Sequence, residues 1–99
     1  MKRIIEFYKD NNDYIFKEND NKIFKINIVE KILNGLDLYN IFFNDYNIND
    51  TFEIIDKTND NDKKDDKMCI AIFNKVKELF TNIENTLKIE LMEKDDKKE

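Results

Sequence analysis

The feature that most constrains the fold of this chain is a long apolar stripe toward its C-terminal end. Between Met68 and Lys94, apolar residues recur three and four positions apart, at Cys69, Ile72, Phe73, Val76, Leu79, Phe80, Ile83, Leu87 and Leu91. This spacing predicts one amphipathic helix over 68–94 of roughly 27 residues, about 40 Å long at 1.5 Å per residue. Such a helix can lie across a sheet, and the charged tail at 95–99 is expected to fray.

The first half of the chain predicts the layer against which this helix packs. Short segments rich in Ile, Phe and Tyr, bounded by Asn and Asp, span residues 3–8, 13–18, 22–28 and 51–57. Alternation places apolar side chains on one face, as with Ile5 and Phe7 on either side of Glu6. We expect antiparallel strands joined by hairpins, because the Asn/Asp clusters at 10–12 and 19–21 tolerate the left-handed conformation of tight turns.

Between the third and fourth predicted strands, the sequence shows helical spacing in one part and ambiguous spacing in the next. Helical spacing and a possible capping box formed by Asn27 and Glu30 predict a short helix over residues 28–34. Gly35 then fits the position just past a helix end, where a left-handed conformation is often needed. Residues 36–44 could continue a helix or form a buried strand, and periodicity does not decide between the two.

A polar break separates the two halves. Residues 58–67 are acidic or polar with several lysines and contain no apolar side chain. Such a segment cannot offset the entropy cost of ordering, so it is expected to be a disordered, solvated loop. At 99 residues, the chain is expected to form a single α+β domain, with a small antiparallel sheet in its β-rich part, 1–57, packed against the C-terminal helix.

Most catalytic chemistry is excluded by composition. The chain has no His and no Ser, which removes the usual nucleophile–base arrangements and His-based zinc sites. One Gly does not provide a Gly-rich phosphate loop. Cys69 lies on the apolar stripe, where a buried thiol is expected. We therefore expect no enzyme activity, no catalytic residue and no cofactor.

One metal pattern has to be weighed. Ligand-type residues at alternate positions match a twelve-residue calcium loop, namely Asp45, Asn47, Asn49, Thr51, Glu53 and Asp56. Against this, Asp50 stands where that loop needs Gly, Asp56 is shorter than the usual Glu, and 51–57 has the pattern of a strand. Chance spacing in a chain rich in Asn and Asp explains the match, so no metal site is expected.

Charge placement is the strongest functional signal. Between Lys31 and Lys57 there is no basic residue, and the five acids of this interval equal the net charge of −5 of the whole chain. Aromatic residues are interleaved with the acids, a mixture that can engage a basic protein surface. The candidate partner-binding residues are Asp37, Tyr39, Asp45, Tyr46, Asp50, Glu53 and Asp56. Alternatively, the aromatics are core and the acids form an ordinary solvated face.

The expected partner is a larger protein with a basic surface. Direct nucleic-acid binding is not expected at a pI of about 4.8. In size, charge and composition the chain resembles anti-CRISPR and other anti-defence proteins of phages and mobile elements, although no motif ties it to a family; it would then inhibit a nucleic-acid-handling protein. The alternative is an assembly module that forms a homodimer or larger oligomer through Leu87 and Leu91 on the long helix.

The cellular compartment is inferred from features that the sequence lacks. A lone Cys cannot form an internal disulfide, and no window approaches the roughly 20 apolar residues of a membrane span. A cytoplasmic location is therefore expected, in a host cell if the gene belongs to a phage. The abundance of Asn, Ile and Lys is typical of an AT-rich genome, so most of the Asn residues carry no functional signal.

Overall fold

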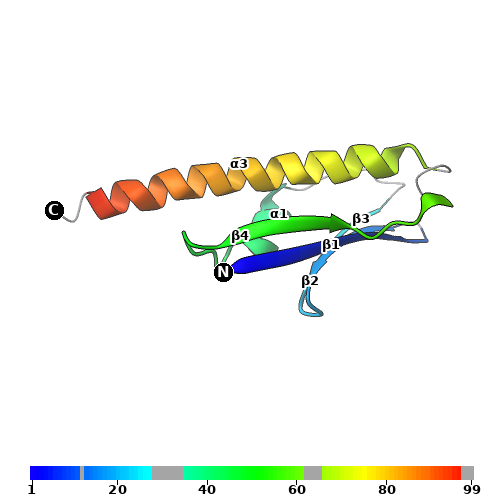
Figure 1. The fold of residues 1–99 in the computed structure, drawn as a ribbon, viewed down its shortest axis with the longest axis horizontal. Helices are drawn as coiled ribbons and strands as arrows, with labels where there is room; N and C mark the ends of the chain where they lie inside the picture. The colour runs from blue at the N-terminus through cyan, green and yellow to red at the C-terminus, as the bar shows by residue number, and fades with distance from the viewer. Residues whose placement is uncertain (12, 28–34, 62–65, 97–99) are drawn as a thin grey trace.

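The computed structural model describes residues 1–11, 13–27, 35–61 and 66–96, the last range with side chains as far as Met92. The elements are β1 (Lys2–Asp10), β2 (Asp13–Glu18), β3 (Lys22–Asn27), α1 (Gly35–Phe42), β4 (Thr51–Asp56) and α3 (Met68–Asp96). They form an α+β fold in which a mixed sheet of order β3-β2-β1-β4 packs against the long helix (Figure 1). The predicted fold class is confirmed.

The first three strands form two consecutive antiparallel hairpins, as the alternation predicts. Their register aligns Phe7 with Phe16 and Phe16 with Phe24 across the sheet. In the turns, Asn11 has a φ of 54° and Asn19 a φ of 56°. These left-handed conformations are the ones that Asn accommodates better than most residues, so the predicted role of both Asn/Asp clusters is confirmed.

Strand β4 differs from the prediction in its direction. It pairs with β1 in parallel, placing Ile54 beside Ile5, whereas an antiparallel sheet was predicted from the sequence. The reason is topological. Strands β3 and β4 occupy opposite edges of the sheet and run in the same direction, so no hairpin joins them.

The core lies between one face of the sheet and both helices. We call this the inner face, and its buried apolar residues are Ile5, Phe7, Tyr14, Phe16, Phe24 and Ile26. Helix α1 adds Leu38 and Phe42, and α3 adds Val76 and Phe80, all at most 2% exposed. The thiol of Cys69 is buried in the same cluster, as expected. Both helices therefore lie on the inner side of the sheet (Figure 1).

Helix α1 settles the stretch that periodicity left open. Residues 35–42 are helical because Leu38 and Phe42, four positions apart, both point into the core. The assignment of Gly35 to a position past a helix end is wrong: Gly35 is the first residue of α1 and its φ is not positive. The predicted helix over 28–34 lies outside the described residues.

Helix α3 begins at the predicted residue and is capped by Asp66. The carboxylate of Asp66 accepts the backbone N–H of Met68 at 3.0 Å, and its carbonyl accepts that of Cys69 at 3.1 Å. Asp66 also forms an ion pair with Lys9 at 3.2 Å and accepts a hydrogen bond from the Tyr14 hydroxyl. The expectation that all of 58–67 is solvated spacer is therefore wrong at Asp66, because sequence alone does not show these contacts.

The C-terminal part of α3 extends beyond the sheet (Figure 1). The helix has 29 residues, about 43 Å at 1.5 Å per residue, whereas six-residue strands such as β2 and β4 span about 20 Å. In the described parts of the chain, no helix combines the length and apolarity needed to cross a bilayer.

Candidate functional site

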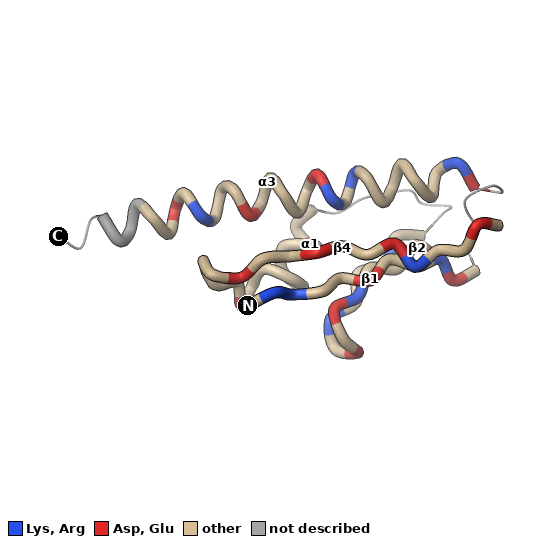
Figure 2. Tube along the Cα trace, in the orientation of Figure 1, with Lys and Arg blue, Asp and Glu red and all other residues tan. Residues whose placement is uncertain are grey.

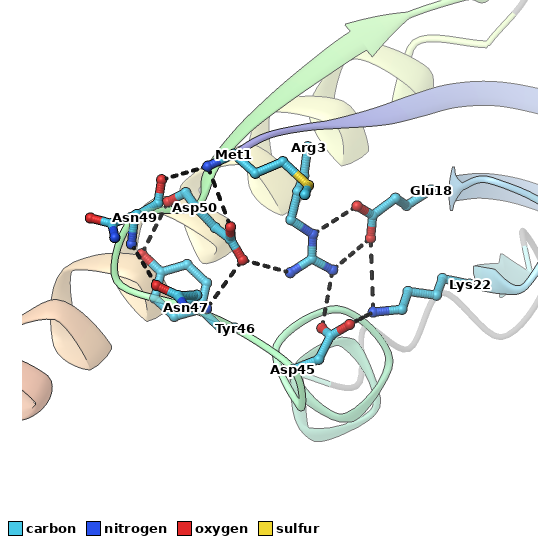
Figure 3. Close-up of polar contacts among 9 residues, drawn as sticks. All are labelled: Met1, Arg3, Glu18, Lys22, Asp45, Tyr46, Asn47, Asn49 and Asp50. Carbon is cyan, nitrogen blue, oxygen red and sulfur yellow. Dashed lines mark hydrogen bonds and ion pairs between the residues drawn. The ribbon is translucent and has the colours of Figure 1, made fainter.

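The first candidate region surrounds Arg3, which alternation along β1 places on the inner face. Arg3 is 7% exposed and makes a two-pronged contact with Glu18, Nε to Oε2 at 2.7 Å and Nη2 to Oε1 at 2.6 Å (Figure 3). Its guanidinium also lies 4.5 Å from the centre of the Phe52 ring. The hydrogen bonds that Arg3 donates to Glu18, with the carboxylates of Asp45 and Asp50 nearby, raise the pKa of Arg3. Arg3 is thus a fixed cation at the rim of the core.

Two predicted partner-binding acids converge on this cation. Asp45 Oδ1 lies 3.2 Å from Arg3 Nη2, and Asp50 Oδ2 lies 3.7 Å from Nη1 (Figure 3). Lys22 also contacts Asp45; its hydrogen bond, together with Arg3, lowers the pKa of that carboxyl. The Met1 ammonium lies 3.6 Å from Asp50.

These contacts form a charge-balanced group. We call it the Arg3 cluster, made up of Arg3, Lys22 and the Met1 ammonium with Glu18, Asp45 and Asp50. Each cation has an acidic counterpart inside the group, so little net charge remains to attract a basic partner. Sequence reasoning missed Arg3; the available signal was its place two residues before Ile5 and four before Phe7 on the inner face.

The aromatic residues of the acidic interval belong largely to the core. Phe42 and Phe43 are 0% and 3% exposed, and Phe43 packs against Tyr46, with ring centres 5.6 Å apart. Tyr46 in turn stacks on Phe52 at 6.1 Å. Tyr39 stacks on Phe43 at 6.2 Å but remains 38% exposed. Of these aromatics, Tyr39 presents the most surface to a partner.

The remaining predicted acids are dispersed. Asp37 is exposed in the first turn of α1, and Glu53 forms an ion pair with Lys2 at 2.8 Å on the opposite side of the sheet from α3. Asp56, at the end of β4, accepts the backbone N–H of Thr58 at 2.9 Å. Acidic and basic residues are interspersed along α3 and the strands (Figure 2). The structure does not gather the acidic interval onto one surface.

Two residues predicted for different roles do come together. Tyr39, predicted for partner binding, and Leu87, predicted for oligomerisation, line one groove between α1 and α3. We call it the Tyr39–Leu87 groove, and its lining is Tyr39, Asn82, Ile83, Thr86, Leu87 and Glu90. Its apolar floor is supported from below, because Ile83 and Leu87 pack against the core cluster. Leu91 lies one turn beyond Leu87 and is half-buried.

Further apolar side chains are exposed outside the groove. Leu36, one turn before Tyr39 on α1, is 68% exposed, and Ile89 and Met92 on α3 are each 59% exposed. The charged residue of the lining is Glu90. The combination of an apolar floor, an aromatic wall and one carboxylate suits an apolar side chain that carries a cation beside it.

Among the described residues, no three His, Cys, Asp or Glu side chains converge as a bound metal ion requires. Residues 45–56, which match the ligand spacing of a calcium loop, instead supply Asp45 and Asp50 to the Arg3 cluster and Thr51–Asp56 to the sheet. Comparison of the chain with protein-family models, curated proteins and solved structures finds no significant match.

Proposed function

We propose that this chain is a protein-binding module whose recognition element is the Tyr39–Leu87 groove. The observation that carries the proposal is the convergence of Tyr39 from α1 and Leu87 from α3 on one apolar depression. A half-exposed aromatic side chain on a fixed helix loses little conformational freedom on binding, which makes Tyr39 a suitable anchor. The floor is held in place by the core, so the site exists before a partner arrives.

The charge near the groove favours a basic partner. Asp37 is exposed on α1 and Glu90 lines the groove from α3, whereas Asp45 and Asp50 are already paired within the Arg3 cluster. An apolar side chain flanked by Lys or Arg would match this surface in both shape and charge. Inhibition of a basic, nucleic-acid-handling protein is one form that such binding takes, and we retain it as the proposed role.

This proposal moves the recognition site from the one expected from sequence. Asp45 and Asp50 hold the Arg3 cluster, so their contribution to binding is indirect, through the position of the loop after α1. Asp37 and Tyr39 remain candidates for direct contact because both are exposed on α1. Tyr46 packs against both Phe43 and Phe52 and supports this end of the core.

A second candidate function is assembly through α3. Its supporting observation is the end of the helix beyond the sheet, where Ile89 and Met92 are exposed and Leu91 is half-buried. Apolar residues on a helix that has no sheet beneath it can pack against another copy of the same helix. If the chain assembles in this way, substitutions at Ile89 and Leu91 should weaken assembly more than substitutions in the groove.

The experiment is a comparative capture from cells that naturally make the chain, using the purified protein and matched variants. Thr86→Arg adds bulk and positive charge to the groove at an exposed position, so it should abolish capture of a specific protein without loss of folding. Leu87→Glu should also abolish capture. Ile89→Glu, outside the groove, and Asp45→Asn should retain the captured protein.

Capture that survives Thr86→Arg and Leu87→Glu would contradict the groove as recognition element. Loss with Ile89→Glu alone, together with a light-scattering mass above that of one chain, would instead establish the assembly function. Each variant is first checked by its thermal unfolding midpoint, since Leu87 contributes to the core and a folding defect would imitate a loss of binding.

A further inference from the structure

One edge of the sheet is open to pairing with a further strand. Strand β4 forms this edge and pairs with β1 on one side (Figure 1). Among the described residues, no strand pairs with its other side. An open edge of this kind is a template on which an extended segment of another protein can add by main-chain hydrogen bonds.

The register with β1 determines which backbone groups of β4 face outward. The N–H of Thr51 donates to the carbonyl of Met1 at 3.0 Å, so the backbone of Thr51 is directed toward β1. Because successive residues of a strand direct these groups to opposite sides, Phe52 and Ile54 direct their N–H and C=O groups away from β1. Within the part of the chain that the structure describes, these four groups have no hydrogen-bond partner. An added strand would supply one for each.

The two edges of the sheet differ in how well they are protected. At the opposite edge, β3 carries Lys22 and Lys25 and is contacted by α1, and both features discourage pairing between edges. In contrast, β4 contains no Lys and no Pro, and its pairing with β1 is not interrupted by a bulge. The devices that protect the β3 edge are therefore missing from β4.

The acids of β4 are balanced by neighbouring bases. Glu53 forms an ion pair with Lys2 at 2.8 Å. Asp56 accepts the N–H of Thr58 at 2.9 Å and is followed directly by Lys57. Two acids and two bases thus leave no net charge along the strand, so the charge preference of the edge is decided by the residues that overhang it.

One side of α3 overhangs this edge. Of the four strands, β4 has the closest backbone approach to α3. Phe73 and Lys77 lie one turn apart on α3, with the ammonium of Lys77 5.5 Å from the centre of the Phe73 ring. Glu84, seven residues after Lys77, shares this side of the helix. Burial and the charge of Glu84 raise the pKa of Tyr46, which stacks on Phe52 of β4. The side that carries Lys77 therefore faces β4.

This side of α3 offers apolar surface and one available cation. Phe73 is partly exposed, as is Ile54 on β4. Glu84 forms an ion pair with Lys88 at 3.7 Å, whereas Lys77 is exposed and forms none with the residues that the structure describes. A strand beside β4 would meet Phe73 and Ile54 with its apolar side chains, and an acidic side chain on it would reach Lys77.

We propose that the edge of β4 binds an extended segment of another protein as a fifth strand, with apolar side chains toward α3 and one acidic residue facing Lys77. Main-chain hydrogen bonds supply the affinity, and Phe73 and Lys77 supply the selectivity. This site is separate from the proposed Tyr39–Leu87 groove. Thr86 of the groove is nine residues from Lys77, which places the two on opposite sides of α3.

The probe is a capped eight-residue peptide that alternates valine and threonine, with one glutamate in place of a central valine. It is titrated into the full chain while NMR follows the exchange of each amide with water. Before addition, the amides of Phe52 and Ile54 should exchange faster than those of Glu53 and Ile55, which face β1. With a dissociation constant of about 100 µM, about 1 mM free peptide should slow exchange at Phe52 and Ile54 about tenfold.

Two variants test the two parts of the proposal. Ile54→Pro removes an outward N–H without removing a bond to β1, and should weaken peptide binding about tenfold or more. Lys77→Glu should weaken binding of the glutamate peptide about fivefold and favour a peptide with lysine at the same place. Lys75→Glu, two residues away on the other side of α3, is the matched control and should change neither. Thr86→Arg should also leave peptide binding unchanged.

Unchanged exchange at Phe52 and Ile54 would overturn the proposal, as would peptide binding that Thr86→Arg abolishes, because the peptide would then lie in the groove. Protection that rises with protein concentration without peptide would assign the edge to a second copy and overturn the partner named here. Equal effects of Lys77→Glu and Lys75→Glu would overturn the acidic preference. Because Ile54 packs against the core, its variant is first checked by its remaining amide spectrum. If it does not fold, the exchange and Lys77 results decide.

Discussion

The hydroxyl of Tyr14 on β2 donates a hydrogen bond to the carboxylate of Asp66, which caps the first turn of α3. The two residues are 52 positions apart in the sequence. Asp66 therefore joins the start of the long helix to the centre of the sheet, and its ion pair with Lys9 adds a contact to β1.

Asp66→Ala should lower the free energy of unfolding by about 2–4 kcal/mol. The loss of a helix cap accounts for about 1 kcal/mol, and the Tyr14 hydroxyl, buried without its acceptor, for about 1–3 kcal/mol more. Denaturant unfolding measures the difference. Asp60→Ala, at an exposed position in the same polar segment, is the control and should change stability by less than about 0.5 kcal/mol. Equal effects of the two variants would show that Asp66 does not anchor the helix.

The contacts of Asp66 also lead us to expect that its contribution to stability depends on pH. Partial burial of Asp66 opposes ionisation, but the hydrogen bonds from Tyr14, Lys9 and the Met68 N–H outweigh it and lower its pKa. A carboxyl whose pKa is lower in the folded state stabilises the fold above its ordinary pKa, near 3.9, and loses that contribution as the pH falls through the folded value. The stability difference between the natural chain and Asp66→Ala should thus be full at pH 7 and narrow below about pH 4. A difference that stays constant down to pH 2 would contradict the ionic role of Asp66.

We expect each ion pair of the Arg3 cluster to contribute more to the free energy of unfolding the more deeply its carboxylate is buried. Arg3→Met keeps the length of the side chain but removes the cation nearest to Glu18, which is 13% exposed, and one of the two cations beside Asp50, which is 14% exposed. A loss of about 3 kcal/mol is expected, because removing one partner of a buried ion pair leaves the other charge poorly compensated. Asp45 is 56% exposed, so Asp45→Asn should cost less than about 1 kcal/mol. Thermal unfolding that ranks the two variants equally would refute this assignment.

The strands could be predicted from the sequence, but the ion pairs between Arg3 and the acidic interval could not. Alternation identified the strands and the inner face because it depends on neighbours along the chain. The pairing of Arg3 with Asp45 and Asp50 depends on β3 and β4 lying at opposite edges of the sheet, which no local pattern encodes. The acids of the interval were therefore interpreted as free charges, although Asp45, Asp50 and Glu53 form ion pairs within the fold.

Other features of the fold that could not be predicted from the sequence also have physical causes. Leu38 and Phe42 fit both a helix and a strand by spacing, and packing on the core decides for α1. The direction of β4 follows from its place at the edge beside β1, which its own sequence does not specify. Tyr39 and Leu87 were each singled out from sequence, but only the arrangement of α1 beside α3 shows that they share a groove.

Phe80 is expected to be the largest single contributor from α3. It is 2% exposed and its ring centre lies 5.1–5.3 Å from those of Phe42, Phe43 and Phe52. Phe80→Ala should cost about 3–5 kcal/mol, enough to unfold much of a chain of this size. Ile89→Ala, on the exposed side of the same helix, should cost less than about 0.5 kcal/mol. An unchanged melting midpoint for Phe80→Ala would contradict the packing of α3 on the sheet.

The most direct test of the proposed function is site-specific photo-crosslinking in cells that naturally make the chain. A photoreactive phenylalanine analogue at position 39 replaces an aromatic residue that is already 38% exposed, and the same analogue at Ile70, 51% exposed near the other end of α3, is the control. The account predicts that position 39 forms an adduct with one basic protein, that Thr86→Arg abolishes this adduct, and that position 70 forms none. An adduct with the same protein from position 70 but not from position 39, or one that persists with Thr86→Arg, would contradict recognition through the Tyr39–Leu87 groove.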